Sequence, residues 1–176
     1  MSRALRRFAL TLLLVPAANL AAQDHDHAPA PAAPHADALV IVLPGGLTRT
    51  LTGAQLAALP RLSGRAEAHG HGWTWEGVDL RGALQLAGIA SVDTLKGPAL
   101  GQVLVFVGAD GYRSVLALAE LDATIGHRRA VLVDREDGAP LTPARLPRRV
   151  IIEGDGRPSR WVTQLVRIEI VELGRR

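Results

Sequence analysis

Cysteine is absent from this chain of 176 residues. Its absence excludes disulfide bonds, cysteine nucleophiles and every metal site that needs a protein thiolate. Aromatic residues are also scarce, at 3% of the chain, and Lys96 is the only lysine among the basic residues. No basic run interleaved with aromatic residues occurs, so the sequence predicts no nucleic-acid partner.

The first 22 residues have the pattern of an export signal. Arg3, Arg6 and Arg7 form a positive start, and residues 8–15 form an apolar run that is too short to span a bilayer. We expect cleavage before Gln23 after Sec export, with twin-arginine export and an uncleaved anchor helix as alternatives. After cleavage the protein is predicted to be periplasmic and not embedded in the membrane. Removal of the three arginines takes the formal net charge from +3 to zero (3 − 3), because this segment holds no acidic residue.

Residues 23–36, which read QDHDHAPAPAAPHA, predict an extended and mobile linker, because alternating alanine and proline form neither a helix nor a core. The histidines and aspartates of the linker are able to capture a metal ion, although short His-rich segments more often bind metals adventitiously. Residues 37–176 then remain for one well-buried domain.

This domain is predicted to be α+β, with mixed, curved or barrel-like sheets and a few short helices, because many short apolar runs alternate with turn signals. Strands are expected at residues 39–43, 47–51, 103–107, 130–134, 149–153 and 165–171. Thr52 and Gln55 form a capping box that predicts a helix up to Leu59, and further helices are expected at 78–88 and 118–123. The glycine-rich residues 64–72 are predicted to be irregular, with a short extended piece at 73–75.

Residues 108–121 contain the most informative motif of the chain. Asp110-Gly111 predicts a hairpin turn, since this dipeptide tolerates positive φ. Tyr112, expected to be buried, begins the return strand, and a helix follows near Leu118. Four further segments belong with this motif, one before it in the chain and three after it, in the order and at the spacing of one known family. They are residues 75–84, 137–141, 146–152 and 154–170, which read WEGVDLRGAL, DGAPL, LPRRVII and GDGRPSRWVTQLVRIEI.

Together these segments, spanning roughly residues 40–172, resemble the oxidoreductase molybdopterin-binding domain, the pterin-holding core of sulfite oxidase relatives. The resemblance implies a sulfite-oxidase-like fold and a pterin ligand, either molybdopterin or a reduced pterin. Enzymes of this family bind molybdenum through the pterin dithiolene and one protein cysteine. Because this chain has no cysteine, we expect no molybdenum and no redox catalysis. The chain is therefore most similar to the standalone, cysteine-less periplasmic pterin-binding subgroup.

Pterin recognition needs flat groups that stack on the ring, a carboxylate for its N–H edge and cationic donors for its oxygens. Five residues of these types lie in the motifs of the resemblance, and Trp73 lies two residues before one of the motifs. We expect all six to form the site: Asp110, Tyr112, Arg149, Arg160, Trp161 and Trp73. His69 and His71 are expected to be mobile loop residues rather than a metal pair.

Four of the six predicted site residues also have an interpretation in which they serve the fold rather than a ligand. Asp110 is able to serve as a turn former and Tyr112 as a core residue. Arg149 requires an ion-pair partner, for which Glu153 and Asp155 are the candidates. Trp73 points the same way as Trp75, two residues on, and at least one of them is expected to pack in the core.

Three functions remain open at this point. The first is a periplasmic pterin-binding protein without redox catalysis, reporting pterin to the periplasmic domain of an inner-membrane signalling protein of the cyclic-di-GMP type. The second is a molybdenum-cofactor oxidoreductase in which another group replaces the cysteine. The third is an interaction module that keeps the fold and has lost the ligand.

Overall fold

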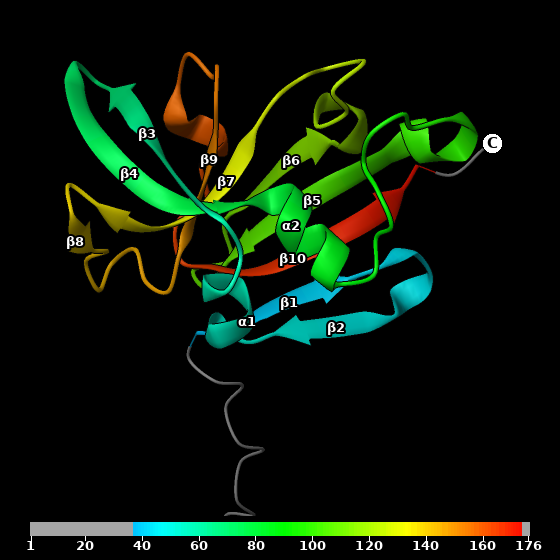
Figure 1. Cartoon of the computed structure of the whole chain (residues 1–176), viewed down its shortest axis with the longest axis horizontal. Helices are drawn as coiled ribbons and strands as arrows, with labels where there is room; N and C mark the ends of the chain where they lie inside the picture. Colours follow the sequence, from blue (N-terminus) through cyan, green and yellow to red (C-terminus); the bar gives the residue numbers. More distant parts are fainter. Residues whose placement is uncertain (1–36, 174–176) are drawn as a thin grey trace, which may run out of the picture. The chain divides into compact units, whose positions relative to one another are not determined.

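The computed structural model describes residues 37–173, which form two five-stranded sheets with short helices between their strands (Figure 1). The predicted signal at 1–22 and the predicted linker at 23–36 lie outside the described residues. None of the helices in residues 37–173 is long and apolar enough to cross a membrane.

The first sheet has the strand order β2-β1-β10-β5-β6. β10 pairs in parallel with β1 and antiparallel with β5, so the C-terminal strand joins the start of the domain to its middle. The bounds of these strands are β1 Leu39–Val42, β2 Thr48–Leu51, β5 Gln102–Gly108, β6 Arg113–Ala117 and β10 Leu165–Glu172. The apolar runs of the sequence therefore predicted these strands to within a few residues.

The second sheet has the order β3-β4-β7-β8, and β9 pairs with the other part of β7. Its strands are β3 Arg61–Ala68, β4 His71–Asp79, β7 Ala130–Glu136, β8 Ala139–Pro140 and β9 Arg149–Ile152. The sheet curls, and its long β3–β4 hairpin projects from the domain (Figure 1).

The hairpin corrects the expectation that residues 64–72 are irregular. His69 and Gly70 both have positive φ and form its turn, so glycine here marks a reversal between two strands rather than a loop. Gly64 lies inside β3, where a Cβ would come within 2.3 Å of Cζ2 of Trp75. The glycine is therefore needed for the close packing of the Trp75 ring on β3.

The helices are short and their starts follow from capping. The predicted capping box is confirmed: Gln55 N donates to Thr52 Oγ1 at 3.2 Å, and Thr52 N donates to Gln55 Oε1 at 2.9 Å. The second helix begins later than expected, because Asp79 caps it and Val78 still belongs to β4. The α-helices are α1 Gly53–Ala57 and α2 Leu80–Leu86, and the 3-10 helices are η1 Pro44–Gly46, η2 Gly97–Gly101, η3 Leu118–Glu120 and η4 Pro158–Arg160.

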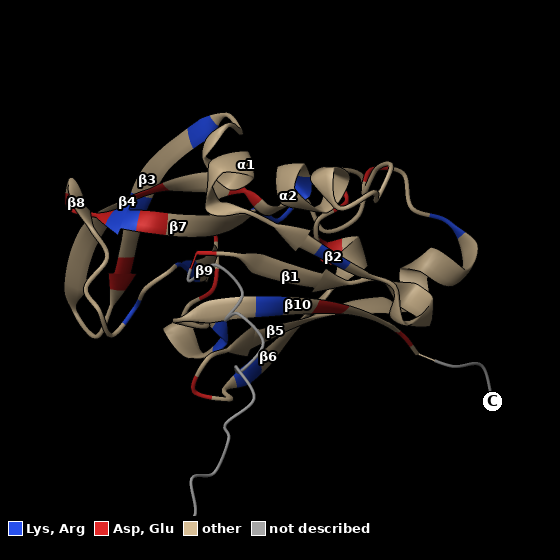
Figure 2. Cartoon of the chain, turned by 90° about the horizontal axis from the view of Figure 1, so that it is seen from below, with Lys and Arg blue, Asp and Glu red and all other residues tan. Residues whose placement is uncertain are grey.

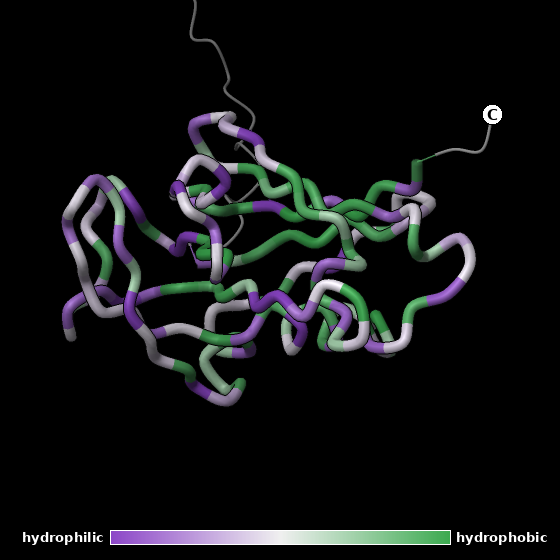
Figure 3. Tube along the Cα trace, turned by 90° about the horizontal axis from the view of Figure 1, so that it is seen from above, coloured by the Kyte–Doolittle hydropathy of each residue, from purple (hydrophilic) through white to green (hydrophobic). Residues whose placement is uncertain are grey.

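The core lies between the two sheets and α2. Figure 3 shows that the strands through the centre of the domain are its most apolar stretches. Fully buried side chains come from all three parts, among them Ile41, Leu104, Phe106, Leu84, Val131, Ile151 and Ile152. The described residues are thus α+β with mixed sheets, one of them curled, as the sequence predicted.

Candidate functional site

A groove lies between the turn of the β3–β4 hairpin and the segment that contains η4. It consists of two adjoining cavities of about 380 and 600 Å³, which share Ala68, His69 and Pro158. The remaining residues of the first cavity are His71, Trp73, Glu136, Asp137, Arg145 and Arg149, and those of the second are Gly156, Arg157 and Ser159. A groove of this size suits a small-molecule ligand.

Arg149, the first residue of β9, forms the buried floor of the first cavity. Its Nη1 donates to Glu136 Oε1 at 2.7 Å, and both side chains are almost fully buried. The guanidinium carbon lies 5.6 Å from the ring centroid of Trp73 and 5.8 Å from that of Trp161. The cation is therefore held by one carboxylate and two indole rings, and burial lowers the pKa of Arg149.

The two tryptophans meet edge to face, with ring centroids 6.1 Å apart and planes at 78°. Trp161 is buried and its Nε1 donates to Ile152 O at 3.2 Å, so this ring is fixed from behind. Trp73 is only half-buried and stacks on His71, with centroids 6.4 Å apart and planes at 19°. Trp73 and His71 thus line the first cavity as two stacked rings, whereas Trp161 supports Trp73 from the core.

Two donors of this cluster lack an acceptor. Arg149 Nε and Trp73 Nε1 are both buried and have no hydrogen-bond partner among the described residues. An unpaired buried N–H is costly, so such groups in a cavity wall are typical of a site that gains its acceptor from a ligand. The two other buried side-chain N–H groups without a partner, on Trp75 and Arg81, lie outside the groove.

Glu136 binds the two arginines of the first cavity. It was not among the site residues predicted from the sequence. Its Oε1 accepts from Arg149, and its Oε2 accepts from Arg145 Nη1. β7 continues through Glu136, beyond the strand expected at 130–134, and the turn that follows is confined to Asp137 and Gly138, which both have positive φ. Figure 2 shows the alternating acidic and basic residues at this end of β7.

Three of the six predicted site residues come together here, namely Trp73, Arg149 and Trp161. The predicted ion-pair partners of Arg149 are wrong: Glu153 pairs with Arg129, and Asp155 pairs with Arg160, while Arg149 pairs with Glu136. The prediction of a core position is correct for Trp75, which is 1% exposed.

Asp110 and Tyr112 are not among the residues that line the groove. Asp110 Oδ1 accepts from Tyr112 N at 2.9 Å, which is the turn interaction expected of an Asp-Gly hairpin. Tyr112 is not buried as predicted, since half of its surface is exposed. Its hydroxyl donates to Ser159 O at 2.5 Å. Tyr112 therefore contacts the main chain of the second cavity's wall and leaves the cavity itself to other side chains.

Arg160 is engaged in a closed ring of ion pairs. Its Nη2 and Nε donate to the two oxygens of Asp155 at 2.6 and 3.1 Å, and its Nη1 lies 3.3 Å from Glu120 Oε1. Arg128 completes the ring by contacting both acids, at 3.2 and 3.7 Å. The hydrogen bonds to Asp155 raise the pKa of Arg160. The ring holds the main chain that carries η4, and so fixes one wall of the groove.

The donors of the groove suit a flat heterocycle better than a metal ion. His69 lies in the hairpin turn and His71 begins β4 directly after it, and both line the first cavity. Among residues 37–173 no group of three or more His, Asp or Glu side chains is placed to hold a metal. Indole and imidazole faces, guanidinium donors and a carboxylate are instead the groups that recognise a polar aromatic ring.

Comparison with known proteins gives a structural match. No protein-family model matches the chain, and no curated protein does. Among solved structures, the crystal structure of the sulfane dehydrogenase SoxCD from Paracoccus pantotrophus is similar, with a TM-score of 0.58 and 19% sequence identity over 76% of this chain. The chain spans only 37% of the length of that protein. This likeness supports the sulfite-oxidase-like fold that the sequence motifs imply, and it shows that the chain shares its fold with part of that sulfane dehydrogenase.

Proposed function

We propose that this protein is an exported, periplasmic pterin-binding protein that performs no redox chemistry. The observation that carries the proposal is the cluster in the groove, in which Arg149 lies between Trp73, Trp161 and Glu136. The same fold occurs in a sulfane dehydrogenase, and the groove supplies both stacking faces and hydrogen-bonding groups.

In this proposal the pterin ring lies against the flat faces of Trp73 and His71 in the first cavity. Arg149 and Arg145 provide cationic donors for the carbonyl oxygen of the ring. Glu136 keeps free lone pairs after its bonds to both arginines, and these accept from the amino edge of the ring. The second cavity takes whatever substituent the ring carries.

Molybdenum does not fit the donors of the chain. Enzymes of the resembling family complete the metal's coordination with a cysteine, and this sequence contains none. The groove offers only nitrogen and oxygen ligands, so no redox step is assigned to it. We further propose that the pterin-loaded protein reports to the periplasmic domain of an inner-membrane signalling protein of the cyclic-di-GMP type, which is the role that the resemblance implies.

The test is a titration of the purified protein with oxidised and tetrahydro pterins, followed by calorimetry or by quenching of tryptophan fluorescence. Trp73→Ala should weaken binding by a factor of about 2–10, because a stacking partner contributes roughly 0.5–1.5 kcal/mol. Leu86→Ala, on the exposed face of α2, is the control and should bind as the wild type does. Failure of the wild type to bind any pterin would refute the proposal.

The competing function is a molybdenum-cofactor oxidoreductase with a non-cysteine metal environment. It is favoured by the similarity to an enzyme, the sulfane dehydrogenase, and by the two histidines at the edge of the first cavity. Elemental analysis of the protein as isolated from the periplasm separates the two functions. We expect no meaningful molybdenum, whereas a near-stoichiometric amount together with sulfite turnover would support the enzyme.

A further inference from the structure

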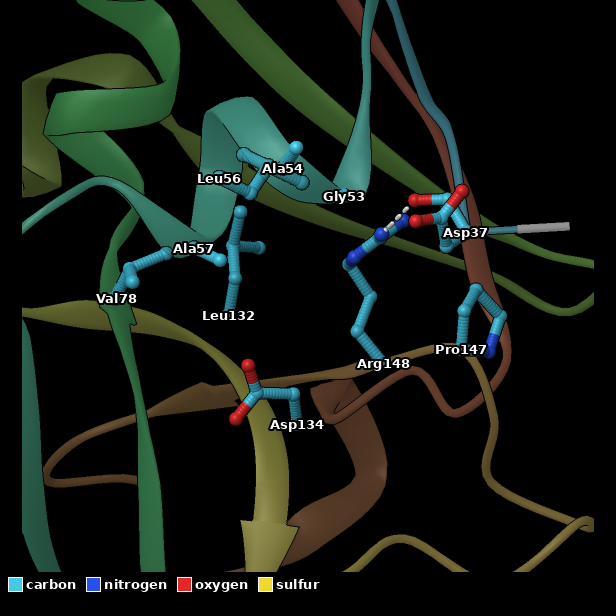
Figure 4. A pocket seen from close by; sticks show the side chains of 10 residues that line it. All are labelled: Asp37, Gly53, Ala54, Leu56, Ala57, Val78, Leu132, Asp134, Pro147 and Arg148. Carbon is cyan, nitrogen blue, oxygen red and sulfur yellow. Dashed lines mark hydrogen bonds between the residues drawn. The ribbon is translucent and has the colours of Figure 1, made fainter. Parts of the chain in front are cut away.

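A separate cavity of about 340 Å³ lies where α1 faces β4, β7 and the segment before β9 (Figure 4). It shares no lining residue with the groove described above. Its walls are chemically divided, because aliphatic side chains form one side and charged groups the other. The aliphatic side consists of Ala54, Leu56, Ala57, Val78 and Leu132, and the charged groups belong to Asp37, Asp134 and Arg148.

Arg148 is the buried cation of this cavity, with 5% of its surface exposed. Its guanidinium reaches across the cavity toward Asp37 (Figure 4) and donates to two main-chain carbonyls, Ala38 O at 3.1 Å and Asp37 O. No carboxylate of residues 37–173 lies within ion-pairing distance of it. A guanidinium has five N–H donors, so Arg148 keeps donors for a carboxylate in the cavity.

Two acidic side chains line the same cavity. Asp134 is neutralised by Arg61, whose Nη1 and Nη2 donate to its two oxygens at 2.7 and 2.6 Å. Each of these oxygens retains a lone pair for a further donor. Asp37 packs its carboxylate on Gly53, where a Cβ would lie 1.9 Å from Oδ2. With Arg61 included, the four charges sum to zero (2 − 2), which suits a ligand that carries one charge of each sign.

The aliphatic side of the cavity determines which uncharged group a ligand can place there. Leu56, Val78 and Leu132 are each at most 5% exposed, so an apolar group placed against them is removed from water. The volume of about 340 Å³ has room for roughly ten water-sized groups of ~30 Å³. A small molecule with a branched aliphatic chain and a compact charged end therefore matches both sides.

We infer that this cavity binds a free aliphatic α-amino acid such as leucine. The ligand carboxylate accepts from Arg148, its ammonium group donates to Asp37 and Asp134, and its side chain packs on Leu56 and Leu132. This site is independent of the pterin groove and holds whether or not a pterin binds there.

Calorimetric titration with three ligands that share the same branched alkyl group tests the assignment: leucine, 4-methylpentanoate, which lacks the ammonium, and 3-methylbutylamine, which lacks the carboxylate. Leucine should bind at least tenfold more tightly than either analogue. 3-Methylbutylamine leaves the buried Arg148 without a carboxylate, and 4-methylpentanoate adds a negative charge near Asp37 and Asp134 with no ammonium to offset it. Equal binding of leucine and 4-methylpentanoate would overturn the assignment, and so would the absence of leucine binding at ~10 mM.

Two variants at the end of α1 distinguish a loss of leucine binding from a loss of folding. Ala57→Leu adds a larger side chain to the cavity wall and keeps Arg148 itself, and it should reduce leucine affinity at least tenfold. Ala58→Leu adds the same side chain at the next, exposed position, which does not line the cavity, and should bind leucine as the wild type does. Trp73→Ala should also leave leucine binding unchanged. Equal leucine affinity of Ala57→Leu and Ala58→Leu would contradict the assignment even if both variants fold normally.

Discussion

Glu136→Gln tests whether the buried charges of the groove depend on each other for their stability. The side chains of Glu136 and Arg149 are 12% and 7% exposed, so removal of the carboxylate charge leaves a buried guanidinium without its counter-ion. Breaking a buried ion pair costs about 3–5 kcal/mol. The glutamine oxygen still accepts a neutral hydrogen bond worth about 1 kcal/mol. We therefore expect the free energy of unfolding to fall by about 2–4 kcal/mol, measured by urea denaturation.

Glu76→Gln is the matched control. Glu76 lies on the neighbouring strand and pairs with Arg135 at 3.6 Å, but their side chains are 43% and 41% exposed. Exposed pairs contribute about 0–1 kcal/mol. Salt distinguishes the two pairs further, because ~1 M NaCl screens an exposed pair and affects a buried one little. A loss for Glu136→Gln no larger than that for Glu76→Gln would refute the reasoning from burial.

Four other outcomes are expected. The Thr124 hydroxyl and main-chain N–H groups lower the pKa of the buried Asp122, so this carboxylate stabilises the fold above its unfolded pKa of ~3.9 and loses that contribution as the pH falls. Asp122→Asn should therefore reduce the loss of unfolding free energy that the wild type shows at acidic pH. The same loss in variant and wild type would contradict this. Gly64→Ala should lower the free energy of unfolding by about 1–3 kcal/mol, because the added Cβ overpacks against Trp75. In the same urea assay Gly156→Ala should change it by no more than ~0.5 kcal/mol, because a Cβ there meets nothing within 4 Å. Deletion of residues 23–35 should leave the thermal midpoint and the pterin affinity unchanged. Asp110→Asn should fold normally, since Asn also suits this turn, and should bind pterin as the wild type does, because Asp110 does not line the groove. A ten- to hundredfold loss of affinity would instead place the Asp110 charge in the site.

The sequence predicted the elements whose signals are local. Thr52 and Gln55 predicted the start of α1, and Asp110-Gly111 predicted the turn between β5 and β6, because both depend on residues next to each other in the chain. β3 escaped prediction because its side chains alternate between exposed and half-buried without a strong apolar pattern, and because Gly64 was taken for a loop residue. Its place in the sheet is set by pairing with β4.

The site was predictable only in part for a related reason. The motif resemblance indicated Trp73, Arg149 and Trp161, which do meet in the groove. The contact of Arg149 with Glu136 depends on how far β7 extends, which the acidic and basic residues around it do not reveal. Tyr112 was predicted to be buried because it begins a strand, but half of its surface is exposed, and its hydroxyl bonds to Ser159, 47 positions away in the chain. Contacts between such distant residues arise from the fold and leave no local signal.

The two consecutive arginines before the apolar part of β9 have a consequence for how this strand finds its place. Val150, Ile151 and Ile152 are all buried, so their apolar pattern does not distinguish one pairing register from the next. Arg148 bonds to carbonyls beside α1, while Arg149 pairs with Glu136 in the groove. A slip of one residue would move one arginine into the environment of the other and would take the second away from its acceptors, at a cost of several kcal/mol. Charge, rather than hydrophobicity, thus selects the register in which β9 joins β7.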